Sequence, residues 1–172
     1  MINDLVIRDG LIVDGTGQPG YRGDISICDG KLIQVGGRAE NGRREINASG
    51  AIVTPGFVDI HTHYDGQVTW DPILASSSLH GVTTAVMGNC GIGFAPVRVQ
   101  DREWLVGLME AVEDIPADTL NAGLPWEWES ITEYMGFLEN QSRVIDIGVQ
   151  ATHASIRTYV MGERGAANEA AT

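Results

Sequence analysis

Two histidines carry the clearest chemical signal in this chain. His61 and His63 stand two residues apart in the segment DIHTH, at the end of an apolar run. Alternate side chains of a strand point to the same face, so the two imidazoles can converge on one point. Imidazole is the commonest metal ligand in proteins, and two convergent rings make half of a zinc site. The alternative is a pair of surface histidines in a loop.

Cys90 is the second candidate ligand. It lies in the turn GNCG, directly after the apolar segment VTTAVM, where a second buried strand is expected to end. A thiol beside a metal ion is deprotonated and can bridge two ions. The spacing alone leaves a small buried thiol equally open. The other cysteine, Cys28, lies in a predicted hairpin strand, where we expect it to pack.

Three further residues are weaker candidates for substrate binding or for supporting the metal ligands. His153 follows a third predicted strand, although a loop histidine with a local hydrogen bond is the simpler interpretation. Tyr64 and Asp65 extend the loop that holds the two histidines. They could orient the ligands or simply form a turn.

Other conspicuous residues are expected to be structural. His80 precedes a predicted strand, at the end opposite the candidate ligands, and is interpreted as a packing residue. Trp126 and Trp128 lie in a long connection and could form an aromatic wall of a binding site, but loop packing is favoured. The acidic segment 109–118, MEAVEDIPAD, is interpreted as a solvated helix end.

The first 54 residues indicate a β module. Asp9-Gly10 and Asp29-Gly30 each lie between alternating apolar runs, the pattern that predicts β-hairpins. We therefore expect an antiparallel module over residues 1–54.

The rest of the chain alternates between predicted strands and helices. Strands are expected over 51–63, 82–88 and 144–151. Helices are expected over 72–80, over 101–114, from Ser130 with a capping box to Glu133, and from about 152 to Thr172. This alternation predicts an α/β fold with a parallel sheet. A closed (β/α)8 barrel needs roughly 250 residues. Residues 55–172 are therefore expected to form the first βα units of a TIM-type barrel in a longer protein.

The amino-acid composition of the chain limits the kinds of molecule that it could bind. The net charge of -12 offers no basic surface for nucleic acid. We also expect no membrane span and no signal peptide. Two cysteines without framework spacing suggest a reducing, cytoplasmic location.

At this point the motifs resemble a known family, the D-aminoacylases (N-acyl-D-amino-acid deacylases) of the metal-dependent amidohydrolase superfamily. The resemblance covers nearly the whole chain and is carried by the segments VTPGFVDIHTHYDGQ, TWDP, HGVTTAVMGNCGIGFAPVR, LMEAVEDIP and WEWES. It implies one or two zinc ions, with His61 and His63 as ligands of one metal site. It also implies that Cys90 is a thiolate ligand, where many relatives use a carboxylated lysine. The resemblance places the remaining ligands and the general base beyond Thr172.

The function that this resemblance implies is hydrolysis of the amide bond of N-acyl-D-amino acids, which are small-molecule substrates. The alternatives are a cyclic amidase of the dihydroorotase or hydantoinase type and a non-catalytic remnant. The 172-residue chain alone is expected to be inactive and poorly soluble, because an incomplete barrel exposes strand edges and apolar faces. Oligomeric state and side-chain preference are not indicated.

Overall fold

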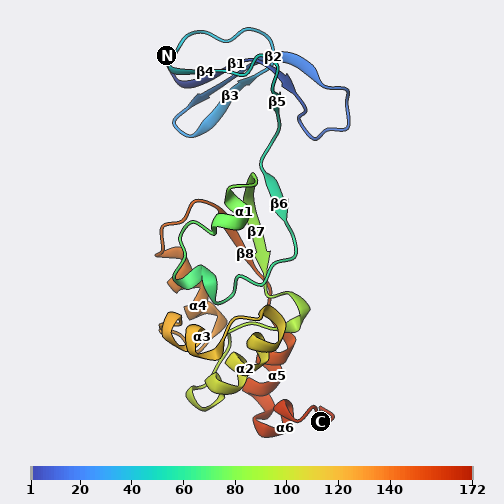
Figure 1. Cartoon of the computed structure of the whole chain (residues 1–172), viewed down its shortest axis with the longest axis vertical. Helices are drawn as coiled ribbons and strands as arrows, with labels where there is room; N and C mark the ends of the chain where they lie inside the picture. The colour runs from blue at the N-terminus through green and yellow to red at the C-terminus, as the bar shows by residue number, and fades with distance from the viewer. Residues whose placement is uncertain (1, 172) are drawn as a thin grey trace. The chain divides into compact units, whose positions relative to one another are not determined.

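The computed structural model describes residues 2–171 and divides the chain into two compact units, Met1–Pro55 and Gly56–Thr172. The first unit contains β1 (Asn3–Ile12), β2 (Tyr21–Cys28), β3 (Lys31–Val35), β4 (Gly42–Asn47) and β5 (Ile52–Val53). The second contains β6 (Phe57–Asp59), α1 (Ala75–Ser78), β7 (Val82–Met87), α2 (Arg102–Glu113), α3 (Ala117–Gly123), α4 (Ile131–Glu139), β8 (Asp146–Val149), α5 (His153–Met161) and α6 (Glu163–Ala166) (Figure 1). Short 3-10 turns lie at Gln67–Thr69, Asn89–Gly91 and Val99–Asp101.

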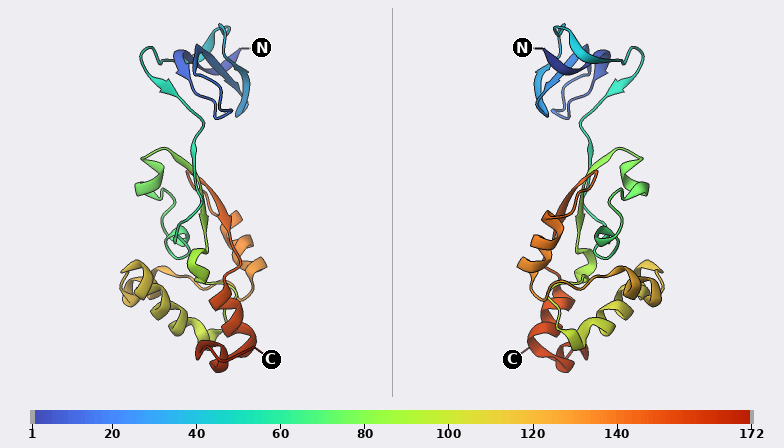
Figure 2. Two further views of the ribbon diagram at one scale, coloured as in Figure 1. Left: turned by 90° about the vertical axis from the view of Figure 1, so that its right-hand side faces the viewer. Right: turned by 90° about the vertical axis from the view of Figure 1, so that its left-hand side faces the viewer.

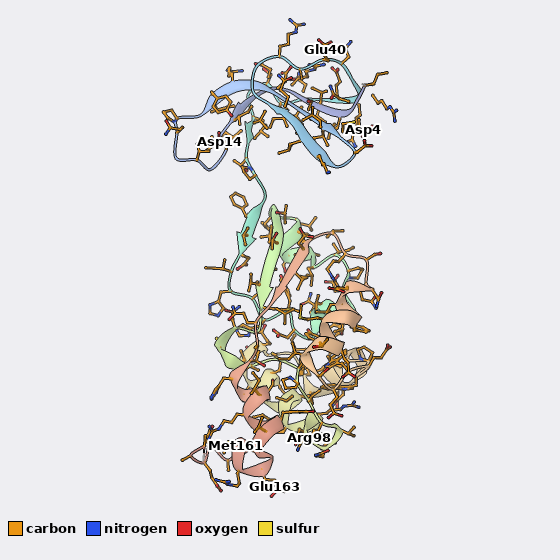
Figure 3. The ribbon with its side chains drawn as sticks, turned by 180° about the vertical axis from the view of Figure 1, so that it is seen from behind. Asp4, Asp14, Glu40, Arg98, Met161 and Glu163 are labelled. Carbon is orange, nitrogen blue, oxygen red and sulfur yellow. The ribbon has the colours of Figure 1, made fainter. Side chains whose placement is uncertain are left out.

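The first unit is built on one sheet with the strand order β3-β2-β1-β4, and β5 also pairs with β1. Figure 3 shows Asp4 and Asp14 at opposite ends of this sheet. The β1–β2 and β2–β3 pairs are antiparallel, whereas β4 and β5 run parallel to β1. The sheet is therefore mixed. Cys28 is buried in β2, as predicted.

One of the two predicted Asp-Gly hairpins is confirmed. Asp29 and Gly30 join β2 to β3, with φ of 50° and 70°. The hairpin predicted at Asp9-Gly10 is wrong, because β1 runs through it and only the pairing register with β2 shifts there. Asp9 has a φ of 55° and its N–H donates to the Asp24 carboxylate at 2.9 Å, so this Asp-Gly pair forms a bulge.

The second unit is built on a parallel sheet with the order β6-β7-β8. Figure 2 shows α4, in orange, beside the strands, while α2 and α5 lie beyond their carboxyl ends. Strands that alternate with helices and pair in parallel confirm the predicted α/β class. No helix within residues 2–171 is long and apolar enough to cross a lipid bilayer.

The strand predicted over residues 51–63 is wrong as a single element. The structure has β5 in the first unit and β6 in the second, separated by residues 54–56. Pro55 interrupts the run because proline has no backbone N–H to donate to a sheet. The prediction of burial on both faces is also wrong, since Phe57 and Val58 of β6 are exposed.

The helix predictions are confirmed within residues 101–139. The helix α2 matches the predicted 101–114, and α4 begins after Ser130 with the predicted capping box. The helix expected to continue to Thr172 is wrong, because α5 ends at Met161 and α6 ends at Ala166. Gly162 interrupts the helical run with φ 62° and ψ -139°. Thr172 itself lies outside the described residues.

The core of the second unit lies between β7, α2, α3 and α4. Its largest fully buried side chains include Met87, Phe94, Leu105, Met109 and Tyr134. The Trp128 indole donates its Nε1–H to the carbonyl of Phe94 at 2.8 Å, so its one polar atom is satisfied. This core fixes the loops that follow β6 and β7.

Candidate metal centre

The candidate ligands lie where the parallel strands end. His61 and His63 follow β6, and Cys90 follows β7, in the 3-10 turn Asn89–Gly91. The β6 and β7 strands are paired in parallel, so their carboxyl ends lie at one edge of the sheet (Figure 1). This edge is where α/β barrels place their active sites.

The structure brings the three side chains together. One donor atom from each of His61, His63 and Cys90 lies within 4.8 Å of the others. The sulfur of Cys90 is 3.5 Å from Nε2 of His61, and the two imidazole centroids are 5.6 Å apart. His61 and Cys90 are exposed, whereas His63 is half-buried, so the cluster is open on one side.

This donor set fits a zinc ion. Two imidazole nitrogens and a thiolate are the ligand types that zinc prefers. Zinc–nitrogen and zinc–sulfur bonds at a tetrahedral angle place a nitrogen and a sulfur about 3.5 Å apart. The Cys90–His61 separation equals that distance. Three protein ligands would leave a position for water or substrate, as in catalytic zinc sites.

The turn around Cys90 has an unusual backbone. Cys90 has a φ of 54°, in the left-handed region that a side chain disfavours. Gly88 has a φ of 85°, and a Cβ there would lie 2.7 Å from the carbonyl oxygen of Gln150. Glycine is therefore required at position 88. The strain at Cys90 is held by the surrounding structure, a pattern concentrated at functional sites.

Asn89 holds this turn to the ends of all three strands. Its Nδ2 donates to the carbonyl of Val86 at 2.9 Å and to that of Thr62 at 3.2 Å. Its Oδ1 accepts from Nε2 of Gln150 at 3.2 Å. Thr62 follows β6, Val86 lies in β7 and Gln150 follows β8. The side chain of Asn89 therefore joins the segments that carry the candidate ligands.

Asp65 holds the same turn from the loop that follows the histidines. The side chain is buried, and its Oδ2 accepts from the Gly88 N–H at 3.1 Å. Burial raises the pKa of the Asp65 carboxyl to about 7, and the charge of Glu113 acts in the same direction. The Tyr134 hydroxyl donates to the Asp65 carbonyl at 2.7 Å, which anchors the loop to α4. Asp65 thus forms a hydrogen bond to the turn that carries Cys90.

Tyr64 and His153 lie near the centre without joining the cluster. The Tyr64 hydroxyl is 2.7 Å from the hydroxyl of Ser77, so it is bonded to α1. His153 is the first residue of α5 and is exposed. A Cβ on Gly91 would lie 3.4 Å from the Cβ of His153, which puts this histidine beside the Cys90 turn.

The residues expected to be structural divide into two groups. The packing role of Trp126 and Trp128 is confirmed, since both contact the hydrophobic core. The packing role of His80 is wrong. This side chain is exposed, and its Nδ1–H donates to the carbonyl of Ser76 at 2.6 Å within the same turn.

Glu113 is the site residue that the sequence interpretation missed. The acidic segment was expected to be solvated, but the Glu113 side chain is only 26 % exposed and its Oε1 lies 3.7 Å from Nδ1 of His63. The only available sequence signal was an acidic residue in the last turn of a helix, where the helix dipole disfavours negative charge.

Known proteins match this chain in sequence and in structure. A sequence profile described as "Amidohydrolase family" matches residues 44–172. An uncharacterized protein of Mycobacterium tuberculosis is 35% identical over 92% of this chain and 26% of its own length. D-aminoacylase of Alcaligenes xylosoxydans xylosoxydans is 29% identical over 92% of this chain and 31% of its own length. The crystal structure of N-acyl-D-glutamate deacylase from Bordetella bronchiseptica, complexed with zinc and a phosphonate inhibitor, matches with a TM-score of 0.77 and 31% identity over 94% of this chain and 32% of that chain.

The chain therefore belongs to the amidohydrolase family. Within that family it falls in the D-aminoacylase branch, as the sequence motifs indicated. Its second unit is part of a TIM-type barrel. The chain spans about a quarter to a third of the length of these relatives.

Proposed function

We propose that the whole protein is a zinc-dependent hydrolase that cleaves the amide bond of N-acyl-D-amino acids to a carboxylate and a D-amino acid. The observation that carries this proposal is the convergence of His61, His63 and Cys90 at the carboxyl ends of β6 and β7. The relatives named as D-aminoacylase and N-acyl-D-glutamate deacylase support the substrate class.

In this proposal the three residues hold one or two zinc ions. A bound zinc ion polarises the substrate carbonyl and lowers the pKa of a coordinated water. His61 and His63 provide neutral nitrogen donors, and Cys90 provides a thiolate whose charge offsets that of the metal. Asp65 and Asn89 keep the Cys90 turn in place through the hydrogen bonds described above. The general base that passes a proton to the leaving amine is expected beyond Thr172.

Two further expectations belong to the whole protein. We infer a small-molecule N-acyl-amino-acid substrate rather than a nucleic acid or a membrane. We also infer a cytoplasmic location, because the two cysteines, Cys28 and Cys90, lack the spacing of a disulfide framework.

The test compares Cys90→Ala with Cys28→Ala in the natural full-length chain that carries these residues. We expect Cys90→Ala to lose bound zinc and hydrolysis of N-acetyl-D-amino acids, while Cys28→Ala keeps both. Zinc is measured by elemental analysis and hydrolysis by release of the free amine. Equal zinc content and activity in the two variants would show that Cys90 is only structural.

The same preparation separates the proposed activity from its alternatives. We expect D- but not L-enantiomers of N-acetyl-amino acids to be hydrolysed. Opening of hydantoin or dihydroorotate rings in place of this reaction would indicate a cyclic amidase. Retained zinc without turnover of any of these substrates would indicate a non-catalytic protein.

A further inference from the structure

Glu113 is the last residue of α2, and its carboxylate faces the imidazole of His63, fifty positions earlier in the chain. Oε1 of Glu113 lies 3.7 Å from Nδ1 of His63. The two side chains are 26 % and 13 % exposed, so both are largely withdrawn from water. Nδ1 of His63 is buried and has no hydrogen-bond partner among residues 2–171. Glu113 is thus the acidic group placed to satisfy that nitrogen.

Nothing in α2 itself accounts for a half-buried carboxylate at this position. The carboxyl end of a helix carries partial negative charge, which disfavours an acidic side chain. The last turn of α2 has no basic residue. The nearby carboxyl of Asp65 is a further acidic group. The contact with the imidazole of His63 compensates the unfavourable position of the Glu113 carboxylate at the end of α2.

The end of α2 fixes the position of Glu113. Asp114 caps the helix in the left-handed conformation with a φ of 54°, and its N–H donates to the carbonyl of Glu110 at 3.1 Å. Met109, one turn earlier, is 1 % exposed in the core. A side chain at a capped and packed helix end is held in place more firmly than one in an open loop.

We propose that Glu113 is a positioning residue of the metal centre, whose carboxylate accepts a hydrogen bond from Nδ1–H of His63 and leaves Nε2 of that ring for the metal. This inference rests on the proposed function, because it assumes a metal at the His61, His63 and Cys90 cluster. Glu113 is not part of that cluster. A 3.7 Å separation is longer than a formed hydrogen bond, and such contacts are often long before the ligand binds. Metal-binding histidines commonly donate their second N–H to a carboxylate, which orients the ring.

The first experiment measures zinc affinity, by competition with a chromophoric chelator, in the natural full-length chain. We expect Glu113→Gln to weaken zinc binding by about 10- to 100-fold. The matched control is Glu103→Gln, which makes the same charge change at an exposed position in the first turn of the same helix. Glu113→Asp, which keeps the carboxylate, is expected to recover part of the affinity. Equal affinity in Glu113→Gln and Glu103→Gln would overturn the proposal.

The second experiment needs no metal. Histidine is labelled with 15N, and the resonances of His63 are assigned with a His63→Gln variant. In the metal-free protein we expect His63 to carry its proton on Nδ1, and Glu113→Gln to shift the ring toward the Nε2–H tautomer. A metal-free wild type with the proton of His63 on Nε2 contradicts the proposal.

The two experiments separate failure of this inference from failure of the proposed function. If the wild type binds no zinc, the proposed function fails, and the tautomer still tests the contact between Glu113 and His63. If the wild type binds zinc through Cys90 and Glu113→Gln binds equally well, only the role of Glu113 fails. If Glu113→Gln does not fold, the wild-type tautomer and the Glu113→Asp affinity decide the outcome.

Discussion

Cys90 combines a candidate ligand with a backbone conformation that a side chain disfavours. The left-handed region costs a non-glycine residue roughly 1–2 kcal/mol, and Cys90 lies there with a φ of 54°. A position selected for stability alone would favour glycine. Under the proposed function, the thiol of Cys90 as a metal ligand accounts for the cysteine at this position.

This argument predicts the stability of two variants. With zinc removed by a chelator, Cys90→Gly should be more stable than Cys90→Ala by about 1 kcal/mol, because glycine adopts a positive φ without strain. Both variants should lose the thiolate and therefore bind less zinc. Urea unfolding followed by circular dichroism measures the difference. A Cys90→Ala variant more stable than Cys90→Gly would show that the turn is not strained.

Asp65 allows a second prediction at the scale of the residue. Asp65→Ala removes the acceptor of the buried Gly88 N–H, and an unsatisfied buried donor costs about 1–3 kcal/mol. Asp65→Asn keeps an acceptor oxygen at the same place and serves as the control. It should therefore lose less stability than Asp65→Ala. Chemical unfolding of the metal-free protein compares the two. Equal losses in both variants would mean that the hydrogen bond to Gly88 contributes nothing.

Among the elements, α4 shows how much a local motif can predict. The serine at position 130 and the glutamate at position 133 form a reciprocal pair: the Glu133 N–H donates to Oγ of Ser130 at 3.2 Å, and the Ser130 N–H donates to Oε2 of Glu133 at 2.8 Å. Such a motif depends only on neighbouring residues, which is why the sequence predicted it. The Asp9-Gly10 pair, by contrast, forms a bulge because of a distant partner, Asp24.

The capping box also predicts a pH dependence. The hydrogen bond from the Ser130 N–H, followed by that from the Glu129 N–H, holds the pKa of Glu133 below its ordinary value of 4.5. The ionised carboxylate therefore stabilises the fold above about pH 4.5. That contribution is lost as the pH falls through the folded-state pKa.

The corresponding experiment uses two variants of α4. Ser130→Ala should destabilise the fold by about 1 kcal/mol at neutral pH. Glu133→Gln should be less stable than wild type at neutral pH, and the difference should shrink as the pH approaches 3. Urea unfolding across this pH range measures both effects. A difference that stays constant with pH would show that the charge of Glu133 is not involved.

At the scale of the whole molecule, the strand β6 exposes apolar side chains at the edge of its sheet. Phe57 and Val58 are 60% and 58% exposed, and within residues 2–171 the strand β6 pairs with β7 alone. An open strand edge with apolar side chains promotes association between chains. The proposed enzyme requires that this surface be covered.

We therefore expect the 172-residue chain, produced alone, to self-associate. Val58→Lys should reduce the association, because charge on an edge strand opposes pairing with another chain. The control is Val99→Lys, at an exposed position outside the sheet, where the side chain is 69% exposed. Light scattering after size exclusion measures the mass. A monomeric wild-type chain would contradict the prediction.

The sequence by itself determined which residues could donate a ligand atom to a metal. It also determined that these residues follow predicted strands. The His-x-His spacing, the GNCG turn and the alternation of strands and helices are local patterns, and they were sufficient to predict the α/β class and the candidate ligands. The tertiary structure decided which side chains meet. It divided residues 51–63 between two units. The hydrogen bond from the Gly88 N–H to Asp65 and the contact between Glu113 and His63 join residues whose relative positions follow from packing. Local sequence carries no record of such contacts, because they form only when the core of the second unit brings the end of α2 and the strand ends together.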